Sequence, residues 1–460
     1  MKTARVTSAF VWLAAGLLGI VAIGRAEAAP HFYVNCSSVA GAPKTCPFGF
    51  EAARVDIFKQ LSSAACILNS TWSHVPRSVT VQSGCRAQFK VTMKVDRPRV
   101  LILTDIGQDP DDTQSLIRTL LYANDLSIEG IVATYRPSRP VASDIVRSVI
   151  TAYDKDLPKL LLHDIRYPKA NALLARVKDG LASNDPIGAG FDTAGSDHII
   201  ASVDASSQPL WVLVWGGSRE LAQAIYKVRN TRSASSFVSF QNKLRVYSID
   251  WSQYSAAPGN YLADNAKDMF WIVSDGYEGT RTATFRGMYL LGDTSMQRSS
   301  WINDNIKNKG NLGALYPLNT TEDGMKEGDT PTLLHLLPTG LGIPTQPSRG
   351  GWGGRYANEP EYAAISTNIY TSRYQKDELG GIVDRRASVA RWRPAYQSDF
   401  AARANWLVSA YADANHPPEA RIDGGTTRTL RSGDLVSLDA SSSDDPDGHD
   451  LTYRWWIYRR

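Results

Sequence analysis

The sequence has 460 residues, 43% hydrophobic and 21% charged, and this composition excludes a chain that is disordered or coiled coil throughout. A chain of this length is typical of two to four domains. Its 50 basic and 46 acidic residues give a formal net charge of +4, and no basic run is present. Because binding to nucleic acid requires a basic surplus that neutralises phosphates, the composition argues against a nucleic-acid partner.

The N-terminus has the features of an export signal. Lys2 and Arg5 precede an uncharged, mostly apolar segment at 6–24, and Ala-Glu-Ala follows at 26–28. A positive start, an apolar middle and small residues at the end are typical of a cleaved secretory signal. An uncleaved membrane anchor is the alternative, since the segment is nearly long enough to span a bilayer. We predict a signal peptide over 1–29 and a secreted or periplasmic protein with no membrane attachment after cleavage.

Four cysteines follow the predicted signal and lie close together in the sequence. They are Cys36, Cys46, Cys66 and Cys85, and the rest of the chain contains none. Clustered cysteines in a small exported module indicate two disulfides, for which three connectivities are possible. A zinc site is the alternative, although no pair has the C-x2-C spacing. We therefore predict a small disulfide-rich β module over 30–95, with strands at 78–81 and 87–91.

Residues 97–412 show a different pattern, in which apolar runs alternate with amphipathic segments. The run at 100–104 is continuously apolar, as in a strand buried on both faces of a parallel sheet. Further strands are predicted at 128–134, 210–215, 244–249 and 269–273, with helices that begin near residues 112, 142 and 220. This alternation predicts an α/β domain with an open, mainly parallel sheet and flanking helices.

The last segment, 418–460, is β-like after a proline-rich linker. Its pattern at 435–441 and 451–456 resembles the first strands of an immunoglobulin-like repeat of the PKD or cadherin type. Such a sandwich needs about 100 residues, so we expect an incomplete, truncated domain here.

Carboxylates gather where the first predicted parallel strand ends and a helix begins. Asp105, Asp109, Asp111 and Asp112 lie within eight residues. Ligands bind at this edge of open α/β sheets. So many carboxylates repel one another unless a cation or bound protons offset their charge, and hard oxygen donors suit Ca²⁺ better than Zn²⁺. The alternative is a solvated acidic turn in which one aspartate caps the helix.

The motif Asp-x-Gly-x-Asp-Pro-Asp-Asp at 105–112 resembles the aspartate cluster of nucleoside hydrolases. With its two extra residues before the paired aspartates, it is more similar to a secreted branch, the cellulose-binding proteins with a nucleoside-hydrolase-like domain. Other motifs shared with that branch lie at 210–217, 221–224, 327–331, 350–356, 391–393 and 399–402. The module at 30–95 resembles a small four-cysteine exported family of unknown function.

The resemblance implies a role for each aspartate. Asp105 and Asp112 would bind Ca²⁺, and Asp105 would also activate water. Asp111 would accept a hydrogen bond from a sugar hydroxyl, and Asp329 would be a distant metal ligand that closes the site. Because of the two-residue insertion, Asp109 is an alternative to Asp105 as a metal ligand.

A second sugar contact is predicted in the glycine-rich motif at 350–356. Trp352 would stack on a sugar ring and Arg355 would hydrogen-bond it. The alternative is that the glycines form a tight loop and that Trp352 packs in the core.

Two positions depart from the purine-type nucleoside hydrolases. Gly328 stands where those enzymes have a histidine that protonates the leaving base, and Tyr135 and Arg136 stand where they have an asparagine. The metal and diol half of the site is therefore present, whereas leaving-group activation is not accounted for.

Two functions follow. The first is an exported hydrolase of N-glycosyl or related sugar linkages, a glycosidase with a calcium-dependent site for a carbohydrate or nucleoside. The alternative is a non-catalytic carbohydrate-binding protein that retains the fold and binds cellulose.

Overall fold

A computed structural model describes residues 31–48, 52–75, 78–93, 97–137, 139–274, 279–418, 420, 422, 431, 433–441 and 443–458. The predicted signal peptide lies outside the described residues. The chain divides into two compact units, Met1–Val95 and Asp96–Arg460. In the part of the chain that is described, none of the helices has the length and apolar character that a membrane span requires.

The first unit consists of two antiparallel sheets of three strands each. One sheet contains β1 (His31–Ser37), β6 (Arg86–Met93) and β3 (Ala52–Gln60), in that order. The other contains β2 (Lys44–Pro47), β5 (Ser78–Val81) and β4 (Trp72–Val75), in that order. Side chains alternate along each strand, so one face of each sheet supplies a small core that includes Val79, Val81 and Phe89. The predicted strands are confirmed.

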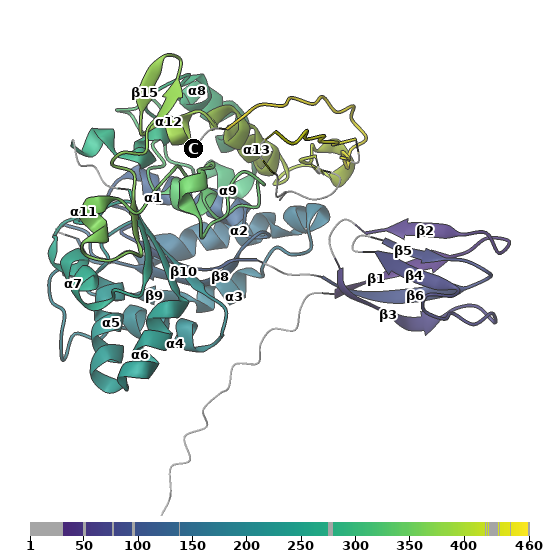
Figure 1. The fold of residues 1–460 in the computed structure, drawn as a ribbon, viewed down its shortest axis with the longest axis horizontal. Helices are drawn as coiled ribbons and strands as arrows, with labels where there is room; N and C mark the ends of the chain where they lie inside the picture. Colours follow the sequence, from purple (N-terminus) through teal and green to yellow (C-terminus); the bar gives the residue numbers. More distant parts are fainter. Residues whose placement is uncertain are drawn as a thin grey trace, which may run out of the picture. The chain divides into compact units, whose positions relative to one another are not determined.

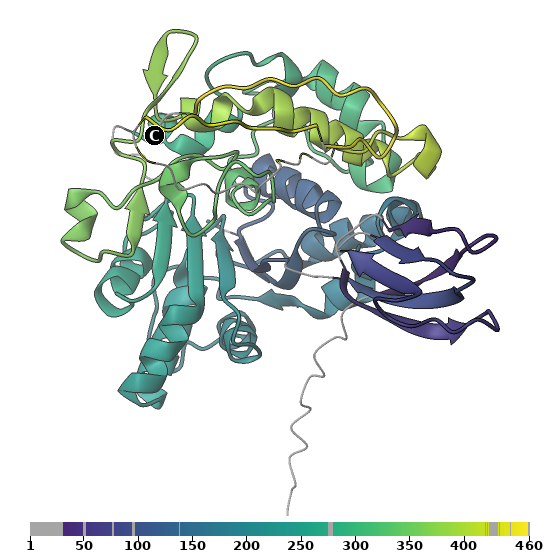
Figure 2. The ribbon, with the colours of Figure 1, turned by 45° about the vertical axis from the view of Figure 1, so that its right-hand side comes forward.

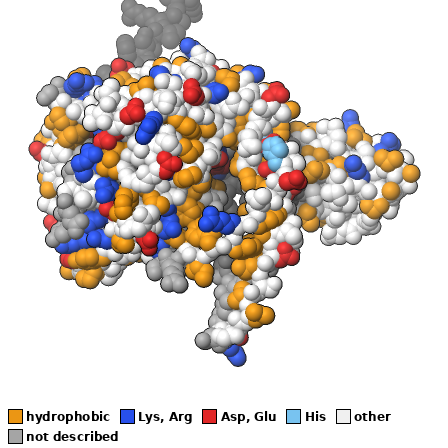
Figure 3. All heavy atoms as spheres, turned by 90° about the horizontal axis from the view of Figure 1, so that it is seen from above, with side chains coloured by type: hydrophobic (Ala, Val, Ile, Leu, Met, Phe, Trp, Pro, Cys, Tyr) orange, Lys and Arg blue, Asp and Glu red, His pale blue; other side chains and the backbone are white. Residues whose placement is uncertain are grey.

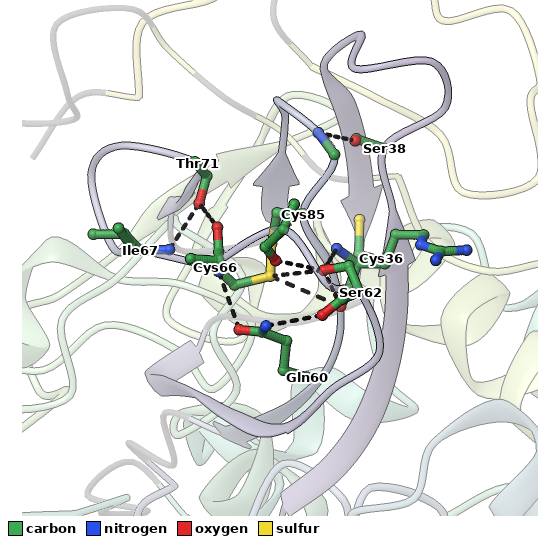
Figure 4. The surroundings of a disulfide bond; sticks show 12 residues. Cys36, Ser38, Gln60, Ser62, Cys66, Ile67, Thr71 and Cys85 are labelled. Carbon is green, nitrogen blue, oxygen red and sulfur yellow. Dashed lines mark hydrogen bonds between the residues drawn. A yellow bond between two sulfur atoms is a disulfide. The ribbon is translucent and has the colours of Figure 1, made fainter.

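Two disulfides cross-link strands and loops within this unit. Cys36 pairs with Cys46, and Cys66 pairs with Cys85. Around the second bond, the backbone N–H of Cys66 donates to Gln60 and that of Ile67 donates to Thr71 (Figure 4). Among the described residues no cysteine is left to bind zinc. A core this small buries little apolar surface, so the disulfides supply stability that packing alone does not.

The second unit is built on a seven-stranded sheet whose neighbouring strands are all parallel. The strands are β7 (Arg99–Thr104), β8 (Ser127–Ala133), β9 (Val177–Asp179), β10 (Leu210–Val214), β11 (Leu244–Ser248), β12 (Phe270–Val273) and β13 (Ile369–Thr371). Their order across the sheet is β13-β12-β11-β10-β7-β8-β9. The prediction of an α/β domain with a mainly parallel sheet is confirmed.

Helices cover both faces of the sheet (Figures 1 and 2). One face packs against α1 (Pro110–Leu121), α2 (Ser143–His163), α3 (Ala170–Ala175) and α10 (Thr330–Leu334). Behind this layer, α9 (Gly310–Ala314) contacts α2, and α13 (Arg393–Asn405) contacts α1. The other packs against α4 (Ala194–Asp204), α5 (Arg219–Thr231), α6 (Ala234–Lys243) and α7 (Ala257–Asn265). Val100 and Ile102 of β7 face the first layer, and Leu101 and Leu103 face the second. A strand buried on both faces must be apolar throughout, which explains its sequence.

Shorter elements complete this unit. They are α8 (Ser299–Ile302), α11 (Pro360–Ala363), α12 (Ala387–Ala390) and the hairpin strands β14 (Asp377–Leu379) and β15 (Ile382–Asp384). Acidic, basic and hydrophobic side chains are interspersed on the face seen in Figure 3, in line with the nearly balanced charge.

The strand order reverses between β7 and β10. The chain leaves β7 toward β8 and β9 on one side, and then continues from β10 on the other side. Connections diverge at such a reversal and leave a crevice at the carboxyl ends of the two central strands. The loops after β7 and β10 border this crevice.

The predicted immunoglobulin-like strands are not confirmed. Residues 433–441 and 443–458, as far as they are described, contain no β-strand. Trp456 and Tyr458 instead contact Trp392, with ring centroids 5.5 and 5.4 Å apart, and the Tyr458 hydroxyl donates to Asp377 over 3.0 Å. A strand requires a neighbouring strand to satisfy its backbone, and this segment is held by side-chain contacts instead.

Candidate metal centre

A cavity of about 150 Å³ lies at the strand-order reversal. It is lined by Asp105, Asp109, Asp111, Asp112, Trp215, Ile249, Asp250, Gln253, Tyr254, Phe285, Arg286, Lys326 and Asp329. Three of these residues lie at the carboxyl ends of strands: Asp105 follows β7, Trp215 follows β10 and Ile249 follows β11. The structure thus brings all five predicted aspartates together at the edge of the sheet where ligands bind.

The first four aspartates are positioned by the start of α1. Asp109 occupies the N-cap position, Pro110 begins the helix, and Asp111 and Asp112 lie in its first turn. The positive end of the helix dipole favours negative charge here. Asp109, Asp111 and Asp112 each offer a carboxylate oxygen, and these oxygens lie within 4.8 Å of one another. Asp109 makes no side-chain cap hydrogen bond, so the alternative of a simple capping turn is not supported.

The distant aspartate, Asp329, is brought to the cavity by α1 itself. Gln114 accepts hydrogen bonds from the backbone N–H groups of Lys326 and Glu327, both over 2.9 Å. The guanidinium of Arg118 pairs with the Glu327 carboxylate over 2.6 Å, and both side chains have no exposed surface. Because these contacts tie residues 326–327 to the helix that carries Asp111 and Asp112, Asp329 faces the same cavity.

Burial and mutual repulsion make these carboxylates hard to ionise together. Burial raises the pKa of Asp105 to about 6, although the Tyr254 hydroxyl donates a hydrogen bond that favours its charged form. Burial, and then the negative charge of its neighbours, raises the pKa of Asp112 and of Asp329 well above the usual range. Burial and the adjacent Asp109 do the same for the pKa of Asp111. Such a site gains stability from positive charge.

Three buried carboxylate oxygens in this cavity lack a hydrogen-bond partner among the described residues. They are Asp105 Oδ1, Asp111 Oδ1 and Asp329 Oδ2. An unpaired buried carboxylate oxygen is costly, and positive charge or a hydrogen-bond donor beside it reduces that cost. The donors are oxygens only, which is the ligand type of Ca²⁺ rather than Zn²⁺. The residues therefore fit a hard divalent cation.

The structure adds three contacts that sequence reasoning missed. The Lys326 ammonium pairs with Asp109 and lies 3.2 Å from Asp111 Oδ2. Burial of Asp109 opposes its ionisation, but hydrogen bonds with Asp111 and Lys326 lower its pKa overall. The hydroxyl of Tyr254, from the loop after β11, donates to Asp105. Lys326 directly precedes the Glu-Gly-Asp motif, so its place near the site could have been predicted from the sequence. Tyr254 belongs to no motif and could not.

The structure also shows the surroundings of the positions that depart from purine-type nucleoside hydrolases. A Cβ atom at Gly328 would lie 3.1 Å from the Phe285 ring and 3.2 Å from Asp111 Oδ2, so the position borders the cavity closely. The Tyr135 ring lies edge-on to Tyr254, with centroids 5.6 Å apart. Arg136 donates to the backbone carbonyls of Gly107 and Pro140 over 3.1 and 2.6 Å.

Trp352 and Arg355 are not among the residues that line the cavity. The half-buried Trp352 contacts Tyr396, with ring centroids 6.3 Å apart. The buried Arg355 lies 3.2 Å from Asp377, and its guanidinium lies over the Tyr458 ring at 4.5 Å. The sugar contact predicted for this pair would therefore be outside the aspartate cavity.

Three family models match the chain. The model described as "Cellulose-binding Sde182, nucleoside hydrolase-like domain" matches residues 99–356. A model of a protein of unknown function matches residues 3–106, and "Cellulose-binding protein Sde0182, C-terminal domain" matches residues 435–460. A search of curated proteins finds no match.

Among solved structures, a nucleoside hydrolase-related hypothetical protein from Saccharophagus degradans, described as associated with carbohydrate metabolism, is 34% identical. The match covers 77% of this chain and 84% of that one, with a TM-score of 0.62. The effector protein XOO4466 is 11% identical over 68% of this chain and 95% of its own, with a TM-score of 0.39. A plant nucleoside hydrolase is 13% identical over 67% and 99%, with a TM-score of 0.36.

Proposed function

The chain belongs to the family of cellulose-binding proteins with a nucleoside-hydrolase-like domain, and from this premise we propose that it is an exported, calcium-dependent hydrolase of N-glycosyl or related sugar linkages. One observation carries the proposal. Three buried, unpaired carboxylate oxygens, on Asp105, Asp111 and Asp329, line one cavity at the strand-order reversal. Two disulfides in the first unit favour an oxidising compartment outside the cytoplasm.

The proposed roles follow from the contacts. Asp105, Asp112 and Asp329 would hold Ca²⁺, which supplies positive charge that binds sugar hydroxyls and makes a water easier to deprotonate. Asp109 is less suited as a ligand, because Lys326 already occupies its carboxylate. Asp111 keeps a free oxygen that would accept a hydrogen bond from a sugar hydroxyl.

Hydrolysis adds water across the glycosidic bond, so that the hydroxyl joins the sugar and a proton reaches the leaving group. Asp105 would accept the proton of the attacking water, and the Tyr254 hydroxyl would hold that carboxylate in place. Protonation of the leaving group is not assigned to a side chain. Lys326 is a weak acid here, since the carboxylates of Asp111 and Asp109 raise its pKa although burial opposes the charge.

This missing proton donor favours a second candidate function. With glycine at position 328 and Arg136 tied to loop backbone, the site would bind a sugar without cleaving it. The chain would then be a cellulose-binding protein that retains the metal site, as the description of its family suggests.

Sugar release from a panel of nucleosides and short β-glucans tests both candidates. The full chain would be assayed with Ca²⁺ and with chelator, beside Asp112→Asn and the exposed control Asp197→Asn, whose partner is Lys227. Release that requires Ca²⁺ and is lost only in Asp112→Asn supports the hydrolase. Unchanged turnover in Asp112→Asn contradicts it. Retention on cellulose without release, weakened in Asp112→Asn, supports the second candidate, and the lack of both retention and release contradicts the two.

A further inference from the structure

Two large aromatic side chains are exposed together on the first unit. Tyr33 of β1 is 44% exposed and Phe58 of β3 is 58% exposed. Their ring centroids lie 4.5 Å apart, with the ring planes tilted by 55°. The two strands are not neighbours, because β6 runs between them. The rings therefore meet across the outer face of β6.

A β-bulge lies at Phe58. In the pairing of β3 with β6 the register shifts between Ile57 and Lys59, so that Phe58 is the extra residue. Ile57 pairs with Phe89 of the core, whereas Lys59 pairs with Gln88. Bulges redirect side chains, and here two consecutive residues, Phe58 and Lys59, are both exposed.

The rest of this face is polar. Asn35 pairs with Gln88, and Tyr33 pairs with Lys90. Residues opposite each other in an antiparallel pair share a face, so amide and ammonium groups lie beside the two rings, together with the carboxylate of Asp56, which pairs with Lys90. A sugar ring has apolar C–H faces and a rim of hydroxyls. Aromatic rings contact the C–H faces of a sugar, and amide or ammonium groups form hydrogen bonds with its hydroxyls.

The core of the unit does not account for these rings. Its buried residues, among them Cys36, Phe89 and Val91, lie on the opposite face of the same sheet. Stabilising pairs in a sheet form between adjacent strands, whereas these rings come from strands separated by a third. A cluster of exposed aromatic side chains with a polar rim is typical of a binding surface.

We propose that Tyr33 and Phe58, flanked by Asn35, Gln88 and Lys90, bind a single β-glucan chain at a surface distinct from the aspartate cavity. The inference rests on the proposed function, because it takes the same class of carbohydrate as the ligand. The tilt between the two rings favours a single glucan chain over the surface of crystalline cellulose. Rings inclined by 55° cannot both lie flat on a crystalline face, but they can follow a twisted single chain.

Affinity for soluble β-glucan and for amorphous cellulose tests the proposal in the full chain. The double variant Tyr33→Ala/Phe58→Ala should bind about tenfold more weakly, since two aromatic contacts are lost. Tyr33→Phe should retain binding because it keeps the ring. The control Val39→Ala/Val75→Ala removes other exposed apolar groups of the same unit, which are 72% and 58% exposed, and should bind normally.

The outcomes separate this surface from the aspartate site. The double aromatic variant should keep its stabilisation by Ca²⁺, because neither ring belongs to the aspartate cavity. Normal binding of β-glucan by the aromatic variant would overturn the proposal. A wild-type chain that binds no β-glucan would also overturn it, even if sugar release remained. A normal unfolding temperature of the aromatic variant shows that a loss of affinity is not a loss of fold.

Discussion

Replacement of Lys326 by methionine should strengthen the binding of Ca²⁺ to the aspartate site. The Lys326 ammonium pairs with Asp109 and lies 3.2 Å from Asp111 Oδ2. It therefore neutralises part of the negative charge that a divalent cation would otherwise meet. Methionine keeps the apolar stem of the side chain and removes the charge.

The magnitude follows from the geometry. Two unit charges 3.2 Å apart attract by about 5 kcal/mol at an effective dielectric constant of ~20. Desolvation offsets most of this, and a hydrogen bond to a charged group contributes about 1.5–3 kcal/mol net. A cation that competes with the ammonium for these carboxylates loses binding free energy of about this size. Without Lys326 the dissociation constant for Ca²⁺ should fall by about 10- to 100-fold.

Calorimetric titration of chelator-treated protein with Ca²⁺ measures the effect. Lys326→Arg keeps the charge, so its affinity should stay near that of the wild type. Without Ca²⁺, Lys326→Met should unfold at a lower temperature, since Asp109 and Asp111 lose their counter-ion. Weaker or unchanged Ca²⁺ affinity in a folded Lys326→Met variant would falsify this competition.

Three further predictions concern the supports of the site. Glu327→Gln should lower the free energy of unfolding by about 3–5 kcal/mol, because it leaves the buried Arg118 charge unpaired; a loss under 1 kcal/mol in urea titration would contradict this. Burial raises the folded-state pKa of Asp105 to about 6, above an unfolded value of about 4. Its protonated form therefore stabilises the metal-free protein below about pH 4, and this stabilisation is lost as the pH rises through 6. In chelator, Asp105→Asn should accordingly gain on the order of 2–3 kcal/mol relative to wild type between pH 4 and pH 7, and a difference independent of pH would refute the shift. Gly216→Ala should weaken Ca²⁺ binding, because its Cβ would lie 2.7 Å from Thr134 Oγ1 and 2.9 Å from Asp105 Oδ1; unchanged affinity in titration would show that the loop yields without moving Asp105.

Local patterns account for the features that were predicted correctly. The strands β7, β8 and β10 are buried on both faces, so their sequences are apolar throughout and can be recognised from the residues alone. Strands β9 and β13 have three residues each, too few to show a pattern, and were missed. The expectation of immunoglobulin-like strands rested on the same kind of pattern, but a strand also depends on a partner that lies elsewhere in the chain.

The class of fold, the cysteine-rich module and the cluster of aspartates at 105–112 could be predicted, because each depends on residues that are neighbours in the chain. Three other features arise only in the folded chain. They are the pairing of the cysteines, the contact between Lys326 and Asp109, and the buried pair of Arg118 and Glu327 near Asp329. These contacts join residues that are distant in sequence, and their energy comes from burial and from charges a few ångströms apart. Neither burial nor such a distance exists until the sheet and its helices have assembled.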